Sequence, residues 1–283
     1  MTRGSDAGTA DGIPRPALAE RRKILDEHLA TLAALLDEAT FGYLDRLGVG
    51  PGWRCWEAGA GAASVPRWLA ARVGETGQVL ATDIDISRLT AAHQAAFGIR
   101  RHNLVTEPAP GSGFDLVHVR LVLEHLPDPA TAVTAMARAL RPGGWLLAES
   151  ADPMLQPLAC PDENGDAQIL ANKVRDAVWA ADPRRGQLRF GRTLPRLLRD
   201  AALTGVTAAA RMPLTGPDTA RLQRTLVLRR RDRLLAAGLL TGAEIHQHLA
   251  DIANGGLDLA AFPVVSAWGR KAGQSRQYAT GPG

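Results

Sequence analysis

The segment from Trp53 to Ser64 (WRCWEAGAGAAS) combines a mainly apolar run with two closely spaced glycines, and it restricts the possible folds more than any other part of the chain. The run predicts a buried strand over residues 54–58, followed by a tight glycine turn and a helix that begins at Ser64. Gly59 and Gly61 have no Cβ atom, so the backbone can approach a ligand closely there. The first amides of the helix and the positive end of its dipole face the same crevice. Glu57 lies just before the turn, at the carboxyl edge where open α/β sheets bind ligands.

Strands and helices are expected to alternate after this turn. Asp128 and Pro129 mark one helix start, because an acidic N-cap residue is followed by proline at the first helical position. Further strands are predicted over residues 78–83, 99–103, 114–120 and 145–149, and helices over residues 64–73, 87–97 and 128–140. Such alternation predicts an α/β fold with a parallel, doubly wound sheet.

The segments before the first strand are predicted to be a disordered tail and two helices. Residues 1–16 are rich in Gly, Ala, Asp and Pro and show no apolar period, which is typical of a disordered tail. The second helix is expected over residues 41–47, ending at Gly48. The first is predicted from leucines at helical spacing, namely Leu25, Leu29, Leu32 and Leu36.

The alternation is expected to lapse after Ser150. A strand is predicted over residues 206–213, a basic helix over residues 218–237, and a helix that begins at the capping box of Thr241 and Glu244. Residues 262–270 are predicted to form a final strand, and residues 272–283 a tail.

Composition and charge exclude several classes of protein. The chain of 283 residues is 46% hydrophobic and 22% charged, as is ordinary for a soluble globular protein. Its formal net charge of +4 is too small to indicate a nucleic-acid partner, and the arginines of residues 218–237 are not interleaved with aromatic side chains for base stacking. No apolar run approaches the length of a membrane span, and no signal segment begins the chain. We therefore expect a cytoplasmic protein without membrane or nucleic-acid partners.

Neither a disulfide framework nor a metal site is expected in this chain. The two cysteines, Cys55 and Cys160, do not form a disulfide framework, and Cys55 is predicted to be a buried thiol. No cluster of His, Cys and Asp has the spacing of metal ligands. We expect no metal site.

Polar residues at the ends of two further strands complete a candidate adenosine site. Asp83 ends the second strand, where a carboxylate can accept hydrogen bonds from both ribose hydroxyls. Asn103 ends the third strand, and its amide can both donate to and accept from an adenine edge. A nicotinamide dinucleotide is disfavoured, because its fingerprint requires glycine where this chain has Ser64.

Four motifs give the chain a resemblance to a known family. They are EAGAG at residues 57–61, ATDID at 81–85, FDLVHVRLVLEHLPD at 114–128 and RPGGWLLAE at 141–149. In their order and spacing they resemble the class I S-adenosylmethionine-dependent methyltransferases over residues 47–150. The resemblance is nearest to the small-molecule methyltransferases of actinobacterial secondary metabolism.

The resemblance implies a fold and a domain layout. The fold is a Rossmann-like doubly wound sheet of seven strands, mostly parallel with the last strand antiparallel, surrounded by N-terminal helices and helical cap insertions. A single methyltransferase domain is implied over residues 17–271. It comprises N-terminal helices (17–50), a cofactor-binding core (51–150), a helical cap with substrate segments and one strand (151–260), and the final strand (261–271).

The resemblance also implies roles for individual residues toward S-adenosylmethionine. Asp83 would hold the ribose with Ile84 against the adenine. Asn103 and Leu104 would bind the adenine amino group and ring, although many relatives have Asp in place of Asn103. Residues near the methionine moiety would be Glu57, Ala58, Gly59, Gly61 and Ser64, and residues near the reacting methyl would be Val119 and Arg120.

The implied chemistry requires few catalytic groups. A sulfonium methyl group is already activated, so the protein mainly aligns the acceptor with it. A hydroxyl acceptor needs a base, and His125 after the fourth strand is the candidate, with local packing or capping as the alternative. His118 lies within a buried strand and is expected to be structural. His246 and His248 lie on a cap helix from which they could reach an acceptor.

Two hypotheses of function follow. The first is a methyltransferase that acts on O, N or C of a small natural-product-like acceptor in secondary metabolite biosynthesis and releases S-adenosylhomocysteine. The second is a protein of the same fold that binds S-adenosylmethionine without transferring the methyl group, because no clear base is present and fold does not determine function. The expected partner is the small-molecule acceptor. Its identity and the oligomeric state, a homodimer included, are left open.

Overall fold

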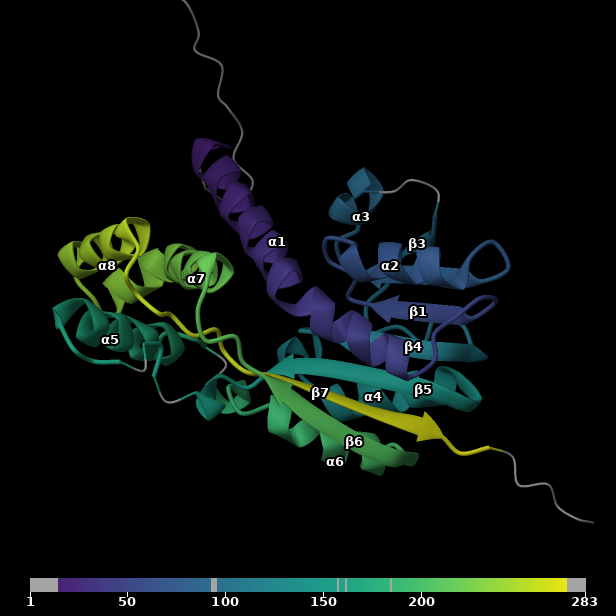
Figure 1. Ribbon diagram of the computed structural model, residues 1–283. Helices are drawn as coiled ribbons and strands as arrows, with labels where there is room; N and C mark the ends of the chain where they lie inside the picture. The colour runs from purple at the N-terminus through teal and green to yellow at the C-terminus, as the bar shows by residue number, and fades with distance from the viewer. Residues whose placement is uncertain (1–14, 93–95, 157, 161, 184, 274–283) are drawn as a thin grey trace, which may run out of the picture. The chain divides into compact units, whose positions relative to one another are not determined.

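The structure is a computed structural model, which describes residues 15–92, 96–156, 158–160, 162–183 and 185–273 (Figure 1). Of the two predicted tails, residues 1–14 and 274–283 lie outside the described residues, and residues 15 and 16 already belong to the first helix. None of the helices within the described ranges is long and apolar enough to cross a membrane.

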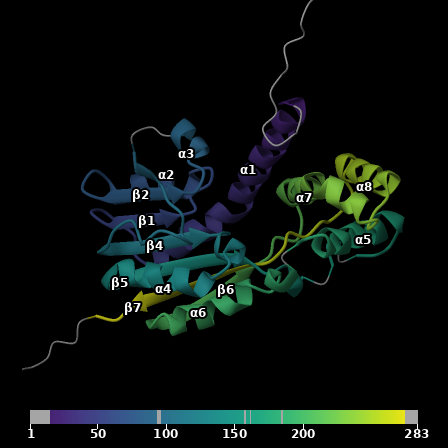
Figure 2. The same cartoon turned by 180° about the vertical axis from the view of Figure 1, so that it is seen from behind.

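Seven strands of the described chain form one sheet in the order β3-β2-β1-β4-β5-β7-β6 (Figures 1 and 2). Strands β3, β2, β1, β4 and β5 pair in parallel, and β7 is antiparallel to both of its neighbours. This arrangement confirms the predicted Rossmann-like sheet with an antiparallel last strand. The strands are β1 (Arg54–Ala58), β2 (Gln78–Asp83), β3 (Gly98–Arg101), β4 (Phe114–Arg120), β5 (Leu140–Ala151), β6 (Leu203–Arg211) and β7 (Val264–Lys271).

The helices connect the strands and form the segments outside the sheet. The α-helices are α1 (Arg15–Arg46), α2 (Ser64–Val73), α3 (Ser87–Ala92), α4 (Pro129–Ala139), α5 (Asp166–Ala180), α6 (Leu194–Asp200), α7 (Pro217–Ala236) and α8 (Gly242–Asn254). Short 3-10 helices are η1 (Leu123–His125), η2 (Pro153–Leu155), η3 (Arg185–Gln187) and η4 (Gly191–Thr193).

The chain divides into two compact units. We call residues 36–157, 184–212 and 262–283 the sheet unit, because they contain the sheet, α2, α3, α4, α6 and the last part of α1. Residues 1–35, 158–183 and 213–261 form the helical unit, with the first part of α1, α5, α7 and α8.

Helix α1 differs from the prediction. Two helices were expected, with the second over residues 41–47, but one continuous helix extends to Arg46. The prediction was wrong because neither Gly nor Pro lies between Leu36 and Phe41 to interrupt the helix. The helix ends two residues before Gly48, whose φ of +85° is left-handed, so the predicted stop at this glycine lies close to the observed end.

Strand β5 also differs, because it begins at Leu140 and not at Trp145. Residues 141–144 were predicted to be a turn, but they form an irregularity within the strand, where the pairing with β4 shifts between Phe114 and Leu116. A Cβ atom on Gly144 would lie 2.7 Å from the Phe114 carbonyl oxygen, so only glycine lets β5 pass this close to β4.

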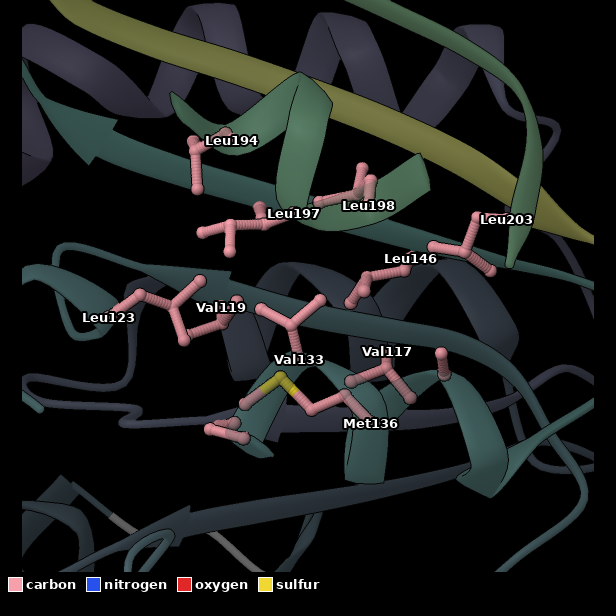
Figure 3. Packing of buried hydrophobic residues seen from close by; sticks show 14 of the residues in the cluster. Val117, Val119, Leu123, Val133, Met136, Leu146, Leu194, Leu197, Leu198 and Leu203 are labelled. Carbon is pink, nitrogen blue, oxygen red and sulfur yellow. The ribbon is translucent and has the colours of Figure 1, made fainter. Parts of the chain in front are cut away.

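Apolar side chains cover both faces of the sheet. On the face covered by α4 and α6, Figure 3 shows Val117 and Leu146 of the sheet directed toward Val133, Met136 and the α6 leucines. The opposite face is covered by α2, α3 and the last part of α1 and contains Leu44, Leu69, Leu89, Leu116 and Leu147. Neighbouring residues of β4, such as Leu116 and Val117, therefore point to opposite faces, as the pleat of a strand requires.

Candidate functional site

The glycine turn after β1 is held against the neighbouring strands. The amides of Gly59 and Ala60 both donate to the Thr82 carbonyl, at 2.8 and 3.0 Å. Gly59 has a φ of +74°, and a Cβ atom there would lie 2.2 Å from Cγ2 of Val122. Gly61 has a φ of +51°, but a Cβ atom there would meet nothing within 4 Å. Gly59 is thus required for packing, whereas Gly61 leaves the space above the turn open.

Asp83 lies against this turn, at the end of β2. Its Oδ2 accepts a hydrogen bond from the Gly61 amide at 3.0 Å, and its Oδ1 accepts one from the Asp85 amide at 3.1 Å. The structure therefore brings together the two parts of the site that lie 22 residues apart in sequence. The role of Asp83 in binding a ribose stays a prediction.

The predicted adenine-binding residues lie in the loops that follow β2 and β3. Ile84 is 60% exposed, although it is aliphatic. Oδ1 of Asn103 accepts a hydrogen bond from the Val105 amide at 2.9 Å, which fixes the amide group within its own loop. Leu104 is half-buried against the core. Contacts of these three side chains with adenine stay predictions.

A polar network lies on the sheet face covered by α1 and α2. Arg120, which ends β4, donates from Nη1 to Oγ1 of Thr40 at 3.0 Å and from Nη2 to Oδ1 of Asp37 at 2.8 Å. The Ser64 hydroxyl at the start of α2 donates to the same Asp37 oxygen at 3.1 Å. Arg120 and Ser64, both predicted site residues, are therefore joined through Asp37 of α1. The neighbouring Val119 points to the opposite face and is fully buried there.

His118 forms the centre of this network. Its Nδ1 lies 2.6 Å from Oε2 of Glu57 in β1, and its Nε2 lies 3.1 Å from Oε2 of Glu149 in β5. Glu149 also accepts hydrogen bonds from the hydroxyls of Thr40 at 2.7 Å and Ser266 at 2.6 Å. His118 is fully buried, and Glu57 is 2% exposed.

The charges of His118, Glu57 and Glu149 depend on opposing effects of burial and of their charged neighbours. Burial alone would lower the pKa of His118, but the charge of Glu57 and the hydrogen bonds to Glu149 and Glu57 outweigh it and raise the pKa to about 9. Burial raises the pKa of Glu57, against the opposing effects of His118 and Arg120. Burial also acts to raise the pKa of Glu149, but the hydrogen bond from His118 and the charges of His118 and Arg120 hold it below its ordinary value. At neutral pH the imidazole of His118 is protonated.

The interpretation of His118 as merely structural did not include these partners. A sequence signal was present: Glu57, His118, Arg120 and Glu149 all occupy positions that face the same side of neighbouring strands. Charged and polar side chains on one buried face are expected to pair with one another, because an unpaired charge is costly to bury.

His125 lies in η1, which begins two residues after Leu121, a residue with a left-handed φ of +57°. His125 is exposed, whereas the neighbouring Glu124 is buried. Glu124 accepts hydrogen bonds from the Ser150 hydroxyl at 2.8 Å and the Ala151 amide at 3.4 Å. The buried anchor of the loop is therefore Glu124, and the role of His125 as a base stays a prediction.

His246 and His248 belong to α8 of the helical unit. His246 is exposed, whereas His248 is 1% exposed, and neither ring nitrogen of His248 has a hydrogen-bond partner among the described residues. Burial lowers the pKa of His248 to about 4, so its ring is neutral at pH 7. Contact of either histidine with an acceptor stays a prediction.

A hollow of about 590 Å³ is lined by the first residues of four strands, Arg54, Gln78, Gly98 and Phe114, and so lies at the edge of the sheet opposite the glycine turn.

Within the described ranges, no group of three or more His, Cys, Asp or Glu residues could hold a metal ion.

Strand order, glycine turn and terminal acid together define a Rossmann-like fold. Residues 56–148 match the model of a family described as a methyltransferase domain. This match covers β1 through most of β5, and therefore both the glycine turn and Asp83.

Curated relatives and a solved structure are similar to the chain. The ubiquinone/menaquinone biosynthesis C-methyltransferase UbiE of Laribacter hongkongensis is 33% identical over 121 residues, which are 41% of this chain and 50% of that protein. Methyltransferase str2 of Strobilurus tenacellus is 36% identical over 98 residues, 34% of each chain. Phosphoethanolamine N-methyltransferase 2 of Haemonchus contortus, solved with S-adenosyl-L-methionine, has a TM-score of 0.51 at 16% identity, over 94% of this chain and 62% of that one.

These similarities differ in what they show. The solved structure shows the fold alone, because its sequence identity is low. The chain spans about half the length of the UbiE proteins that it matches. Residues 56–148 are therefore similar to a methyltransferase domain.

Proposed function

We propose that the chain is an S-adenosylmethionine-dependent methyltransferase that transfers a methyl group to O, N or C of a small natural-product-like acceptor. The observation that carries the proposal is the position of Asp83 against the open glycine turn at Gly61, inside the segment that matches a methyltransferase domain. A role in secondary metabolism and a cytoplasmic location belong to the same proposal. The name of UbiE, a C-methyltransferase, favours carbon among the three acceptor atoms.

The residues present fit S-adenosylmethionine. The turn at Gly61 leaves room for the methionine moiety to approach the backbone, and the Asp83 carboxylate can receive ribose hydroxyls. Exposed Ile84 offers an apolar surface to adenine, beside Asn103 and Leu104. Bound there, the cofactor would supply an activated methyl group.

The chain itself contributes position and charge. Glu57 and Ala58 end β1, Ser64 begins α2, and Arg120 is fixed by Asp37 and Thr40 where β4 ends. These contacts hold the carboxyl edge rigid, which is what alignment of two reactants requires. A nucleophile that can attack without first losing a proton, such as a neutral amine or an enolate carbon, needs no base at this edge.

One observation favours a second function, which is binding of S-adenosylmethionine without methyl transfer. Both ring nitrogens of His118, the imidazole beside Glu57, are within hydrogen-bond distance of carboxylates, so this ring cannot take a proton from an acceptor. His125 would then be the main candidate base, with His246 and His248 as the alternatives. An acceptor whose methylation requires proton removal would decide between the two functions.

Calorimetric titration with S-adenosylmethionine and with S-adenosylhomocysteine tests the proposal. We expect both to bind with micromolar affinity, and we expect Asp83→Ala to abolish binding in a folded protein. Asp85→Ala is the matched control, because it removes a carboxylate from the same loop that caps the Ser87 amide and does not touch Gly61. Unchanged affinity in Asp83→Ala would exclude this site. A screen of acceptors for release of S-adenosylhomocysteine then distinguishes transfer from binding alone.

A further inference from the structure

Four neighbouring strands place polar side chains on one buried face of the sheet. Glu57 of β1 pairs in register with His118 of β4, and Glu149 of β5 pairs in register with Ser266 of β7. All four side chains face the side covered by α1 and α2, where Leu116 and Leu147 supply the apolar surroundings. The network therefore crosses the sheet directly below the turn that begins after Ala58.

The geometry restricts which protonation states this buried group can adopt. Ionised carboxylates only accept hydrogen bonds, so a ring nitrogen that contacts one must donate. Nδ1 of His118 contacts Glu57 and Nε2 contacts Glu149, at 2.6 and 3.1 Å. With both carboxylates ionised, both nitrogens carry protons and the ring is an imidazolium. Its positive charge offsets one of the two negative charges that the sheet buries.

Charged and polar groups around His118 come from each element that packs against it. Glu57 lies on β1 and Glu149 on β5, and Arg120, two residues further along β4, is paired with Asp37 of α1. Thr40 of α1 donates to Glu149 and accepts from Arg120, so it links the two halves of the network. The orientation of Glu57 is thereby coupled through His118 to the last part of α1.

We propose that His118 is a positioning residue for the cofactor site: its imidazolium holds the Glu57 carboxylate in a fixed direction beneath the glycine turn, so that Glu57 can receive the ammonium group of the methionine moiety. The inference rests on the proposed function, because it takes S-adenosylmethionine as the ligand. A neutral imidazole can donate to only one of the two buried carboxylates, and an absent imidazole donates to neither, so Glu57 then turns or takes up a proton.

The test compares His118→Gln with Trp56→Phe. The first substitution keeps a polar side chain at this position but removes its charge. Trp56 lies next to Glu57 in β1 but on the opposite face, where its Nε1 donates a buried hydrogen bond to Oγ1 of Thr82 at 2.9 Å, so Trp56→Phe removes one buried hydrogen bond and leaves the network intact. Affinity for S-adenosylmethionine is measured by calorimetry, and folding by circular dichroism.

We expect His118→Gln to weaken binding by about tenfold or more, which is the range for a lost hydrogen bond to a charged group, and Trp56→Phe to leave it unchanged. The affinity of the unmodified chain should fall above pH 9 relative to that of the His118→Gln variant. The amine of the ligand titrates near pH 8 for both proteins, so the difference between the two profiles isolates His118. Equal affinities and parallel profiles would overturn the inference. An unmodified chain that binds no S-adenosylmethionine would instead overturn the proposed function.

A measurement on the unmodified chain covers the case in which His118→Gln does not fold. In a sample labelled with ¹⁵N-histidine, one imidazole should remain protonated at both nitrogens at pH 8, and its signals should shift when S-adenosylmethionine is added. His28 and His248 cannot give this signal, since burial lowers the pKa of both. Absence of the imidazolium signal, or a signal that the cofactor leaves unmoved, would contradict the role assigned to His118.

Discussion

Nδ1 of His118 lies 2.6 Å from Oε2 of Glu57, across two parallel strands that place both side chains in the interior of the sheet. The contact joins residues that are 61 positions apart in sequence. Glu149, on a third strand, contacts the other ring nitrogen of His118. A charged pair buried in this way depends on both partners, because the loss of one leaves the other without compensation.

The first prediction is that stability decreases between pH 6.5 and pH 9. The folded chain holds a proton on His118 up to about pH 9, whereas an unfolded histidine releases it near pH 6.5. The contribution of His118 is therefore fully present below pH 6.5 and is lost as pH rises to about 9. One proton gives a slope of at most about −1.4 kcal/mol per pH unit. Urea unfolding at several pH values measures it, and a flat profile through this window would contradict the prediction.

The second prediction separates two glycines of the same turn. Gly59→Ala should destabilise the chain by about 3 kcal/mol, because the new Cβ atom would lie 2.2 Å from Val122 and the backbone is left-handed. Gly61→Ala should cost only about 1 kcal/mol, because the space is open and only the left-handed backbone is strained. Its affinity for S-adenosylmethionine should nevertheless fall. Urea unfolding and calorimetry measure the two effects.

Val122→Ala added to Gly59→Ala serves as the control for this pair. It removes the methyl groups that the new Cβ atom would strike, so part of the lost stability should return. A double variant no more stable than Gly59→Ala would show that the strain lies in the backbone alone.

The sequence predicted some elements to the residue and others poorly, for physical reasons. Strands β1, β2 and β4 have the predicted bounds, because each is a short apolar run with glycine or charged residues beside it. The start of β5 was missed because Gly143 and Gly144, which usually indicate a turn, here allow an irregular pairing with β4. Local sequence does not distinguish these two uses of glycine.

Of the candidate site, the contact of Asp83 with the turn at Gly61 followed from the strand ends, because parallel strands bring their carboxyl ends to one edge. The partners of His118 did not follow, because they depend on the register of three strands. Arg120 was expected near the reacting methyl group, and its bonds to Asp37 and Thr40 depend on the path of α1, which was predicted to be interrupted.

The third prediction concerns the contact of Arg120 with Asp37. These side chains are 12% and 21% exposed, and their atoms lie 2.8 Å apart. A double-mutant cycle with Arg120→Ala and Asp37→Ala should give a coupling energy of about 1–2 kcal/mol, more than surface pairs provide. The exposed pair of Arg72 in α2 and Asp45 in α1 is the control and should give less than about 0.5 kcal/mol. Equal coupling in the two cycles would show that burial does not strengthen the Arg120 pair.

The fourth prediction concerns His248 in the helical unit. Its ring is buried, and neither nitrogen has a partner among the described residues, so the folded state has lost the hydration of both nitrogens without replacing it. His248→Leu should therefore leave the stability at pH 7 unchanged or increase it by about 1 kcal/mol. Urea unfolding measures the change, with His246→Leu, an exposed position on the same helix, as the control.

The substitution His248→Leu should also change how the free energy of unfolding depends on pH below 6.5. Burial lowers the pKa of His248 to about 4 and that of His28 to about 3, whereas both are near 6.5 in the unfolded chain. Both groups therefore contribute stability that is present above pH 6.5 and is lost as pH falls toward those values. His248→Leu should remove its share of this loss and flatten the profile between pH 6.5 and pH 4, and His246→Leu should not. A His248→Leu variant that is less stable at pH 7 by more than about 1 kcal/mol would show that the imidazole forms a bond worth more than its dehydration costs.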